Sequence, residues 1–334
     1  MKILFVTSTR IGDAILSTGL LEHLRAEHAD LEVTVACGPA AAPLFKALPG
    51  LKRIIVLDKM VFSLHWLRLW VLSIGTFWDL VVDLRNAPAT YFLGCKKRRG
   101  MPRNGSEGRR VERIARVLDL PEIVPPKLWT STREENLAKE LLPDGGPILA
   151  IGPTANWRAK TWRSEYFAEL IQRLTSPSGI LPGARVALLG RDDERPMALR
   201  LMDSIPDEKR IDLVGKLDLL TAYACLARST FYIGNDSGLM HLAAASGVPT
   251  LGLFGPTKEE LYAPWGENAG IVRTDLSFDK IFPKNFDYRT SDSLMDSLTV
   301  DMAEDGARAL WQEKPRSVAS AVSARLGCRA GLVP

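Results

Sequence analysis

The residues best suited to chemistry lie in residues 231–245, where an apolar run leads through small polar residues into a helix-forming segment. Asp236, Ser237 and Gly238 fall at that junction. A helix starting there presents free backbone N–H groups and the positive end of its dipole, which suits a phosphate. Gly238 would let the phosphate approach the backbone closely. The alternative interpretation is that Asp236 or Ser237 only caps the helix.

His241 follows Ser237 by four residues, so it lies on the same face of the predicted helix, near its start. It either orients a phosphate-bearing ligand or is a core histidine beneath the helix. The other three histidines, His23, His28 and His65, lie in amphipathic patterns and are interpreted as structural or exposed.

Positive charge is concentrated in residues 96–113, which hold eight basic and two acidic residues, a net +6 against +4 for the whole chain. Three glycines and a proline predict that much of this stretch is a mobile loop. It would attract an anionic ligand or an anionic membrane surface, with a plain solvated loop as the alternative. Nucleic acid is disfavoured because no set of aromatic residues is interleaved with the charges.

Residues 60–76 are rich in large apolar side chains, with only His65 and Arg68 charged or titratable. Such a helix either rests in a bilayer interface with its tryptophans at headgroup level or packs in the core between sheet and helix. The polar interruptions leave too short an apolar run for a membrane-spanning helix.

The elements that must position these residues alternate between short β-rich runs and helical patterns, which indicates parallel sheets wrapped by helices. In the first half, strands are expected at 3–7, 32–36, 53–57 and 80–84, with a helix at 13–25. In the second half, strands are expected at 148–151, 186–189, 211–214, 231–234 and 250–254, with a helix capped by Ser164.

The periodicity stops at residues 141–147, where two glycines and two prolines predict an interdomain linker. We therefore expect an α/β protein of two Rossmann-like domains, residues 1–145 and 146–313, that face each other across a cleft. A tail at 314–334 follows, and its pattern permits a terminal helix.

Composition and missing motifs narrow the chemistry. The 334 residues are 46% hydrophobic and 25% charged, which is typical of a globular protein of two domains. The four cysteines lie too far apart for a zinc or redox motif, so a reduced, cytoplasmic protein is expected, and the first residues have no signal-peptide pattern. A dinucleotide fingerprint, a P-loop, an Asp-x-Asp site and a zinc-protease motif are all missing from the sequence.

In combination, the motifs resemble the signature of the heptosyltransferases of glycosyltransferase family 9, which build the lipopolysaccharide inner core and have the two-Rossmann GT-B fold. The resemblance covers most of the chain and rests on Arg-Ile-Gly-Asp at 10–13, the loop at 153–162 and Asp-Ser-Gly-x-x-His at 236–241. It implies an inverting transfer of heptose from ADP-L-glycero-D-manno-heptose to a Kdo- or heptose-bearing lipid A.

Inversion in one displacement needs a base for the acceptor hydroxyl proton and positive charge for the departing nucleotide diphosphate. The resemblance implies that Asp13 is the base and that Lys160 binds the diphosphate. The alternatives are that Asp13 is favoured only by the helix dipole and that Lys160 is solvated surface. Thr154 and Asn156 share the loop of Lys160 and are expected to donate hydrogen bonds to phosphate.

The other expected site residues follow from the same resemblance and from the concentration of charge. Donor binding is expected of Asp236, Ser237, Gly238 and His241. Acceptor binding is expected of Arg10, Arg98, Arg99, Arg109 and Arg110.

No cofactor is expected, because the nucleotide sugar is a substrate, and no metal is expected, because the sequence has no metal-binding motif. The expected partners are this donor and a lipid-linked anionic oligosaccharide, with peripheral contact at the cytoplasmic face of the inner membrane, no nucleic acid and a monomeric chain. Gly19 replaces a proline usual in the family, and residues 282–288 replace a cysteine-rich stretch. These departures leave the donor sugar and the acceptor position open. The alternative functions are a GT-B-type transferase or epimerase that uses another nucleotide sugar, and a non-catalytic sugar-nucleotide binding protein.

Overall fold

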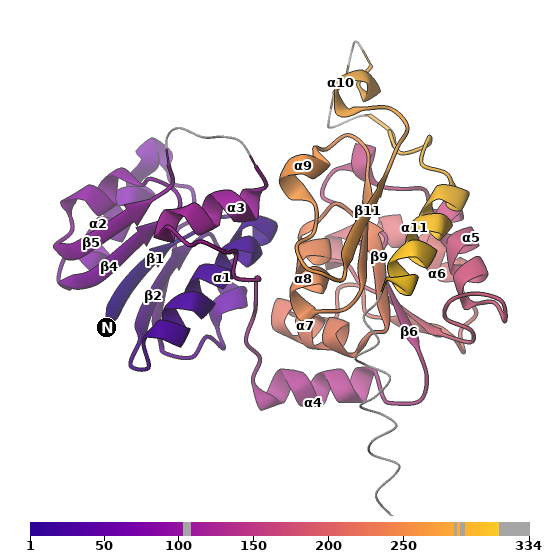
Figure 1. The fold of residues 1–334 in the computed structure, drawn as a ribbon, viewed down its shortest axis with the longest axis horizontal. Helices are drawn as coiled ribbons and strands as arrows, with labels where there is room; N and C mark the ends of the chain where they lie inside the picture. The colour runs from indigo at the N-terminus through magenta and orange to yellow at the C-terminus, as the bar shows by residue number, and fades with distance from the viewer. Residues whose placement is uncertain (103–107, 284–285, 288–290, 314–334) are drawn as a thin grey trace, which may run out of the picture.

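The computed structural model describes residues 1–102, 108–283, 286–287 and 291–313. It has two parallel β-sheets, each in its own α/β domain, and the two domains stand side by side (Figure 1). The tail predicted at 314–334 lies outside the described residues. Within the described part of the chain, no helix combines the length and apolar character needed to cross a membrane.

The first domain contains a five-stranded sheet with the order β3-β2-β1-β4-β5. Its strands are β1 (Lys2–Val6), β2 (Glu32–Cys37), β3 (Leu51–Val56), β4 (Trp78–Asp83) and β5 (Cys95–Gly100). Its helices are α1 (Ile11–Glu27), α2 (Leu64–Ser73) and α3 (Arg110–Ala115), with short 3₁₀ segments η1 (Ala42–Phe45), η2 (Val61–Ser63), η3 (Pro88–Phe92) and η4 (Arg116–Leu118). The four predicted strands and the helix are confirmed, with ends shifted by one or two residues.

The predicted mobile loop at 96–113 is wrong. Residues 95–100 form the edge strand β5, paired parallel with β4, and α3 starts at Arg110. Residues 103–107 lie outside the described part of the chain. The sequence of β5 has no apolar alternation because an edge strand carries charges on positions that face solvent.

The second domain contains a six-stranded sheet with the order β11-β10-β9-β6-β7-β8. Its strands are β6 (Ile148–Gly152), β7 (Arg185–Leu188), β8 (Arg210–Asp212), β9 (Phe231–Asn235), β10 (Thr250–Phe254) and β11 (Ala269–Arg273). Its helices are α5 (Ser164–Thr175), α6 (Arg195–Ser204), α7 (Leu219–Arg228), α8 (Gly238–Ser246), α9 (Glu259–Tyr262), α10 (Phe278–Ile281) and α11 (Val300–Gln312), with 3₁₀ segments η5 (Arg158–Lys160) and η6 (Asp192–Glu194).

The central strands β6, β9 and β10 are buried along their whole length, as their continuous apolar sequences predict. The predicted face of α5 is buried as well, with Phe167, Leu170 and Leu174 in the core. One detail is wrong: Ser164 is the first residue of α5, and Arg163 stands at the capping position without a capping side-chain bond.

Helix α4 (Thr132–Leu141) packs against α7, beside the second domain, although the expected boundary places it in the first. The chain passes between the domains before α4, along α1. There the Lys127 amide donates to Thr18 Oγ1 at 2.9 Å, and Lys127 Nζ lies 2.6 Å from Glu22 Oε1. The predicted linker at 141–147 instead joins α4 to β6.

This crossing of the chain over α1 explains why position 19 has a glycine. A Cβ on Gly19 would lie 2.2 Å from the carbonyl oxygen of Val124 and 3.1 Å from its carbonyl carbon. Gly19→Ala should therefore destabilise the fold by about 1–3 kcal/mol, even though alanine is the better helix former by roughly 1 kcal/mol. Thermal denaturation measures the change. Gly75→Ala is the matched control, since nothing lies within 4 Å of its added Cβ, and equal melting temperatures for the two variants would contradict the prediction.

Candidate active site

A cavity of about 1350 Å³ lies between the two domains. Residues 9–13 line it from the first domain, and segments that follow β6, β7 and β9 line it from the second. All of these segments leave the carboxyl ends of parallel strands, where open α/β sheets bind their ligands. The cleft predicted from the two Rossmann-like halves is therefore present.

The N-terminal ends of α1 and α8 meet at this cavity. A Cβ on Gly238 would lie 3.0 Å from Ile11 Cγ2, and a Cβ on Gly12 would lie 2.8 Å from His241 Cδ2, so both glycines permit the close approach. Ser237 stands at the capping position of α8 but its side chain makes no capping bond, which argues against the capping-only interpretation. Two positive helix ends and their free amides thus converge on one space.

Lys160 and Asp236 form an ion pair in the wall that the second domain contributes. Lys160 Nζ lies 3.4 Å from Asp236 Oδ2, and the two side chains are only 12% and 10% exposed. Lys160 ends η5 after β6, and Asp236 follows β9, so neighbouring strands deliver the two charges. The lysine is therefore held in the cavity and is not solvated surface.

Asp13 lies on the opposite wall, in the first turn of α1. Its Oδ1 accepts a hydrogen bond from Arg110 Nε at 3.0 Å, and the carboxylate side chain is 16% exposed. Arg110 is the first residue of α3, so a second helix fixes the direction of the carboxylate.

His241 is buried, as a core histidine would be, and it also lines the cavity. Burial lowers the pKa of His241, while the carboxylates of Asp236 and Asp13 oppose that shift. The imidazole is therefore neutral at pH 7 and has one donor and one acceptor nitrogen to offer. Its Nδ1 has no hydrogen-bond partner among the described residues.

Thr154 and Asn156 both line the cavity. Thr154 is buried, and its hydroxyl donates to Glu194 Oε2 at 2.7 Å, so its single proton is already directed at a carboxylate. Glu194 is a cavity residue that sequence reasoning missed. The available signal was its place in an acidic run that begins four residues after the end of β7.

Comparison with known proteins decides the family. The model of glycosyltransferase family 9 (heptosyltransferase) matches residues 108–285, slightly more than half of the chain. The chain belongs to this family.

Individual relatives agree with that assignment. A lipooligosaccharide heptosyltransferase 2 from Haemophilus influenzae is 25% identical over 314 residues, covering 82% of this chain and 88% of the relative. The solved ADP-heptose LPS heptosyltransferase II of E. coli aligns with a TM-score of 0.73 at 21% identity, over 94% of this chain and 99% of that one. The solved E. coli heptosyltransferase WaaC with ADP aligns with a TM-score of 0.70 at 19% identity. The alignment covers 93% of this chain and 100% of that one. The predicted α/β GT-B fold is confirmed.

The five arginines expected to bind acceptor separate into different places. Arg10 lines the cavity, and Arg110 reaches it through Asp13. The Arg109 guanidinium, at the capping position of α3, lies 5.6 Å from the centre of the Trp265 ring. This contact links α3 to the second domain. The other two arginines, Arg98 over the Tyr91 ring at 4.8 Å and Arg99 paired with Asp119 at 2.9 Å, do not line this cavity.

An aromatic wall lies where the resemblance led us to expect a cysteine-rich stretch. Trp157 stacks on Phe282 with ring centres 6.4 Å apart, and Phe282 meets Phe286 edge-on at 4.7 Å. All three rings line the cavity. Sequence reasoning noted the departure but not that these rings close one side of the site.

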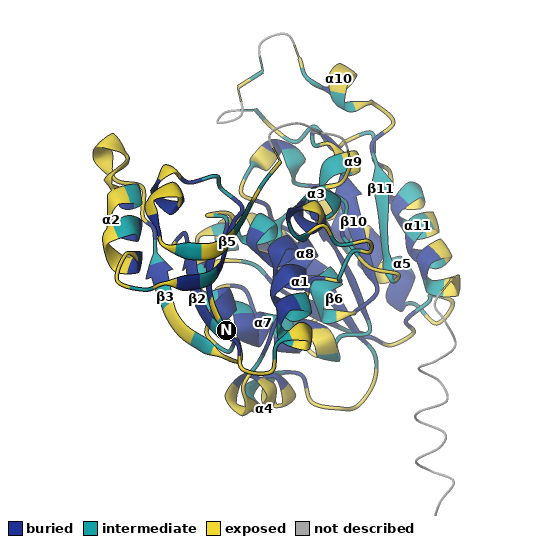
Figure 2. Cartoon of the chain, turned by 60° about the vertical axis from the view of Figure 1, so that its left-hand side comes forward, coloured by how far each residue is buried: buried dark blue, intermediate teal, exposed yellow. Residues whose placement is uncertain are grey.

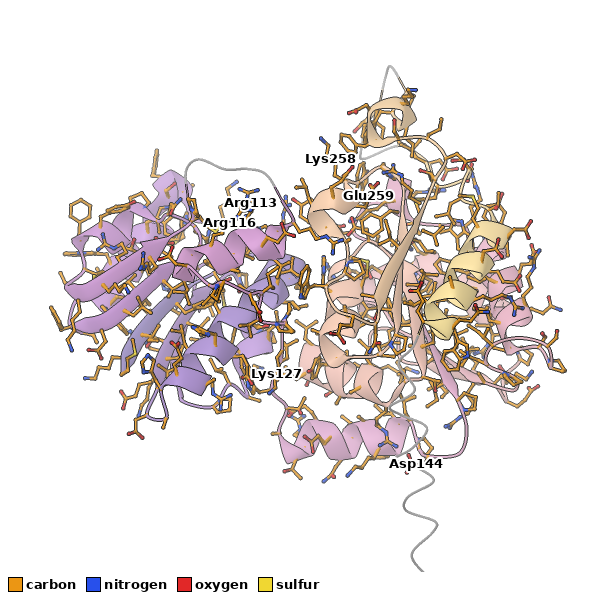
Figure 3. The ribbon with its side chains drawn as sticks, viewed as in Figure 1. Arg113, Arg116, Lys127, Asp144, Lys258 and Glu259 are labelled. Atoms are coloured by element: carbon orange, nitrogen blue, oxygen red, sulfur yellow. The ribbon has the colours of Figure 1, made fainter. Side chains whose placement is uncertain are left out.

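The opening between the domains continues beyond the main cavity. Figure 3 shows Arg113 on α3 and Arg116 at the start of η4 on one side of the gap, with Lys258 and Glu259 at the start of α9 on the other. Arg113, Lys258 and Glu259 line a second cavity of about 690 Å³. Lys127 lies between the two domains, before the chain enters α4, and Asp144 lies just past the end of α4 at the lower end of the view (Figure 3).

Proposed function

We propose that this protein transfers a heptose, with inversion, from ADP-L-glycero-D-manno-heptose to the inner core of lipopolysaccharide. The observation that carries the proposal is that Asp13 and Lys160, delivered by opposite domains, line one cavity together with the uncapped end of α8. Membership in the heptosyltransferase family supports the choice of sugar.

The geometry supports a single displacement. The acceptor oxygen bonds to the anomeric carbon as the bond from that carbon to the diphosphate oxygen breaks, and ADP departs. Asp13 takes the acceptor hydroxyl proton, and Arg110 holds the carboxylate in position. Lys160 and the amides of α8 stabilise the charge that develops on the diphosphate.

The acceptor in this proposal is an anionic oligosaccharide linked to a lipid, which enters on the side of the first domain near Arg10. The chain then works at a membrane surface, because its acceptor is anchored there. One copy of the chain supplies both walls of the cavity, which supports a monomer as the working unit.

We also propose that transfer needs no metal ion, since Lys160 and the α8 dipole already supply positive charge to the leaving group. Turnover should therefore be unchanged in excess EDTA. The measurement is ADP release with and without chelator, with added Mg²⁺ as the reverse control. A strict requirement for a divalent ion would contradict this part of the mechanism.

The decisive experiment offers a panel of nucleotide sugars with Kdo- and heptose-bearing lipid A acceptors and follows both ADP release and the glycosylated product by mass spectrometry. We expect product only with ADP-heptose and an acceptor. Turnover of a UDP-sugar alone, or epimerisation without an acceptor, would contradict the proposal. Binding of ADP-heptose without turnover on any acceptor would indicate a non-catalytic binding protein.

A further inference from the structure

The exposed apolar side chains of the protein are concentrated in one region. Among the described residues, fourteen large apolar side chains are exposed, and eleven of them fall between residues 60 and 92. We call these eleven the apolar face: Met60, Val61, Phe62, Leu64, Leu67, Val71, Leu72, Ile74, Phe77, Tyr91 and Phe92. Figure 2 shows α2, which carries several of them, at the outer edge of the first domain.

A hydrogen bond and a cation–π contact join the parts of the apolar face. Trp70 Nε1 donates to the Phe92 carbonyl at 3.2 Å, which connects α2 to η3. The guanidinium of Arg98 lies 4.8 Å from the centre of the Tyr91 ring, which connects η3 to the edge strand β5. Helix α2 buries His65, Leu69 and Ser73 and packs the half-buried Trp66 and Trp70 against the core, so the prediction of core packing holds for this inner side alone.

Phe62 is the most exposed member, at 96%. Its φ is +49°, and that of the following Ser63 is +58°, both in the left-handed region that non-glycine residues avoid. The unfavourable backbone at Phe62 and Ser63 therefore holds a phenyl ring in contact with water. Both costs are offset if the ring inserts into an apolar environment.

The charge around the apolar face is strongly positive. Residues 51–102 hold nine lysines and arginines against three aspartates, a net +6 where the whole chain has +4. Lys59 and Arg68 are exposed beside the apolar residues, and Lys97 is exposed on β5 next to Lys96, which pairs with Asp79 at 2.6 Å. A partner complementary to this face must be apolar inside and negatively charged at its surface. An anionic lipid bilayer has both properties.

We propose that the apolar face and β5 dock the first domain on an anionic phospholipid membrane. Phe62, Leu67 and Phe92 enter the boundary between headgroups and acyl chains, and Lys97 and Arg98 lie at the lipid phosphates. The proposal goes beyond the transferase function, since it concerns plain phospholipid and needs no sugar acceptor.

The test is cosedimentation of the full chain with vesicles of phosphatidylethanolamine and phosphatidylglycerol, compared with vesicles of phosphatidylcholine. We expect binding to the anionic vesicles, weak binding to the neutral ones, and loss in 1 M salt, where the Debye length is about 3 Å. Phe62→Ser/Phe92→Ser should weaken binding at least about tenfold, because two rings no longer enter the bilayer. Lys97→Gln should weaken it roughly fivefold.

The matched control is Met197→Ser/Leu199→Ser, which removes two exposed apolar side chains of α6 in the second domain and should leave vesicle binding unchanged. Melting temperature and ADP affinity report that every variant is folded. If the wild-type chain does not bind anionic vesicles, or if Phe62→Ser/Phe92→Ser binds them equally well, the proposal is wrong.

A lipid-free dimer that Phe62→Ser/Phe92→Ser dissociates in sedimentation velocity would also overturn the proposal, because the apolar face would then be a contact between copies. Activity on a delipidated, soluble acceptor separates this inference from the transferase proposal. Phe62→Ser/Phe92→Ser should keep that activity. If the wild-type chain has no activity on the soluble acceptor, the result counts against the transferase function only.

Discussion

Asp13→Asn should lower kcat by about 10² to 10⁴ while ADP affinity and melting temperature stay close to those of the wild type. The amide keeps the shape of the carboxylate, and its oxygen can still accept the hydrogen bond that Arg110 Nε donates to Asp13 Oδ1. What disappears is the basicity that takes the acceptor hydroxyl proton. Steady-state ADP release with saturating acceptor measures kcat, and calorimetry measures ADP affinity.

Two comparisons make this prediction specific. Asp203→Asn removes an exposed carboxylate from α6, which does not line the cavity, and should leave kcat unchanged. A variant at Asp13 with near-normal turnover would place the base elsewhere. A lower melting temperature with normal turnover would make Asp13 a helix-start residue whose contact with Arg110 is only structural.

The interior of the fold could be predicted because buried parallel strands have continuous apolar sequences. Strands β6, β9 and β10 are of this kind. The two missed strands, β5 and β11, lie at sheet edges, where one side lacks a partner strand and burial constrains the sequence less, although the other two edge strands, β3 and β8, were predicted. The charges of β5 favoured a loop for the same reason.

The cavity residues that belong to motifs could also be predicted, because each motif lies at a strand end. What the sequence could not indicate is which residues far apart along the chain meet at the cavity. The bond between Arg110 and Asp13 joins residues 97 positions apart, and the packing of Gly12 on His241 joins opposite domains. Neither contact has a local period or spacing, so only the assembled structure reveals that Arg110 positions the expected base.

Lys160→Ala should weaken ADP binding about 10- to 150-fold, as expected for the loss of one charge-assisted contact of roughly 1.5 to 3 kcal/mol. Calorimetric titration with ADP measures the change. Lys209→Ala, an exposed lysine of the same domain, is the matched control and should bind ADP normally. The single variant alone is ambiguous, because it also leaves the buried carboxylate of Asp236 unpaired and repulsive to a diphosphate.

A double-mutant cycle with Asp236→Asn resolves the ambiguity. If Lys160 contacts the diphosphate directly, Lys160→Ala/Asp236→Asn should bind ADP at least about tenfold more weakly than Asp236→Asn alone. If Lys160 only neutralises Asp236, removing both charges should restore wild-type affinity, and the assignment of Lys160 to the diphosphate would be lost. The 3.4 Å separation of the ion pair favours the first outcome, since a lysine held this loosely can turn toward a stronger anion without leaving its place in the wall.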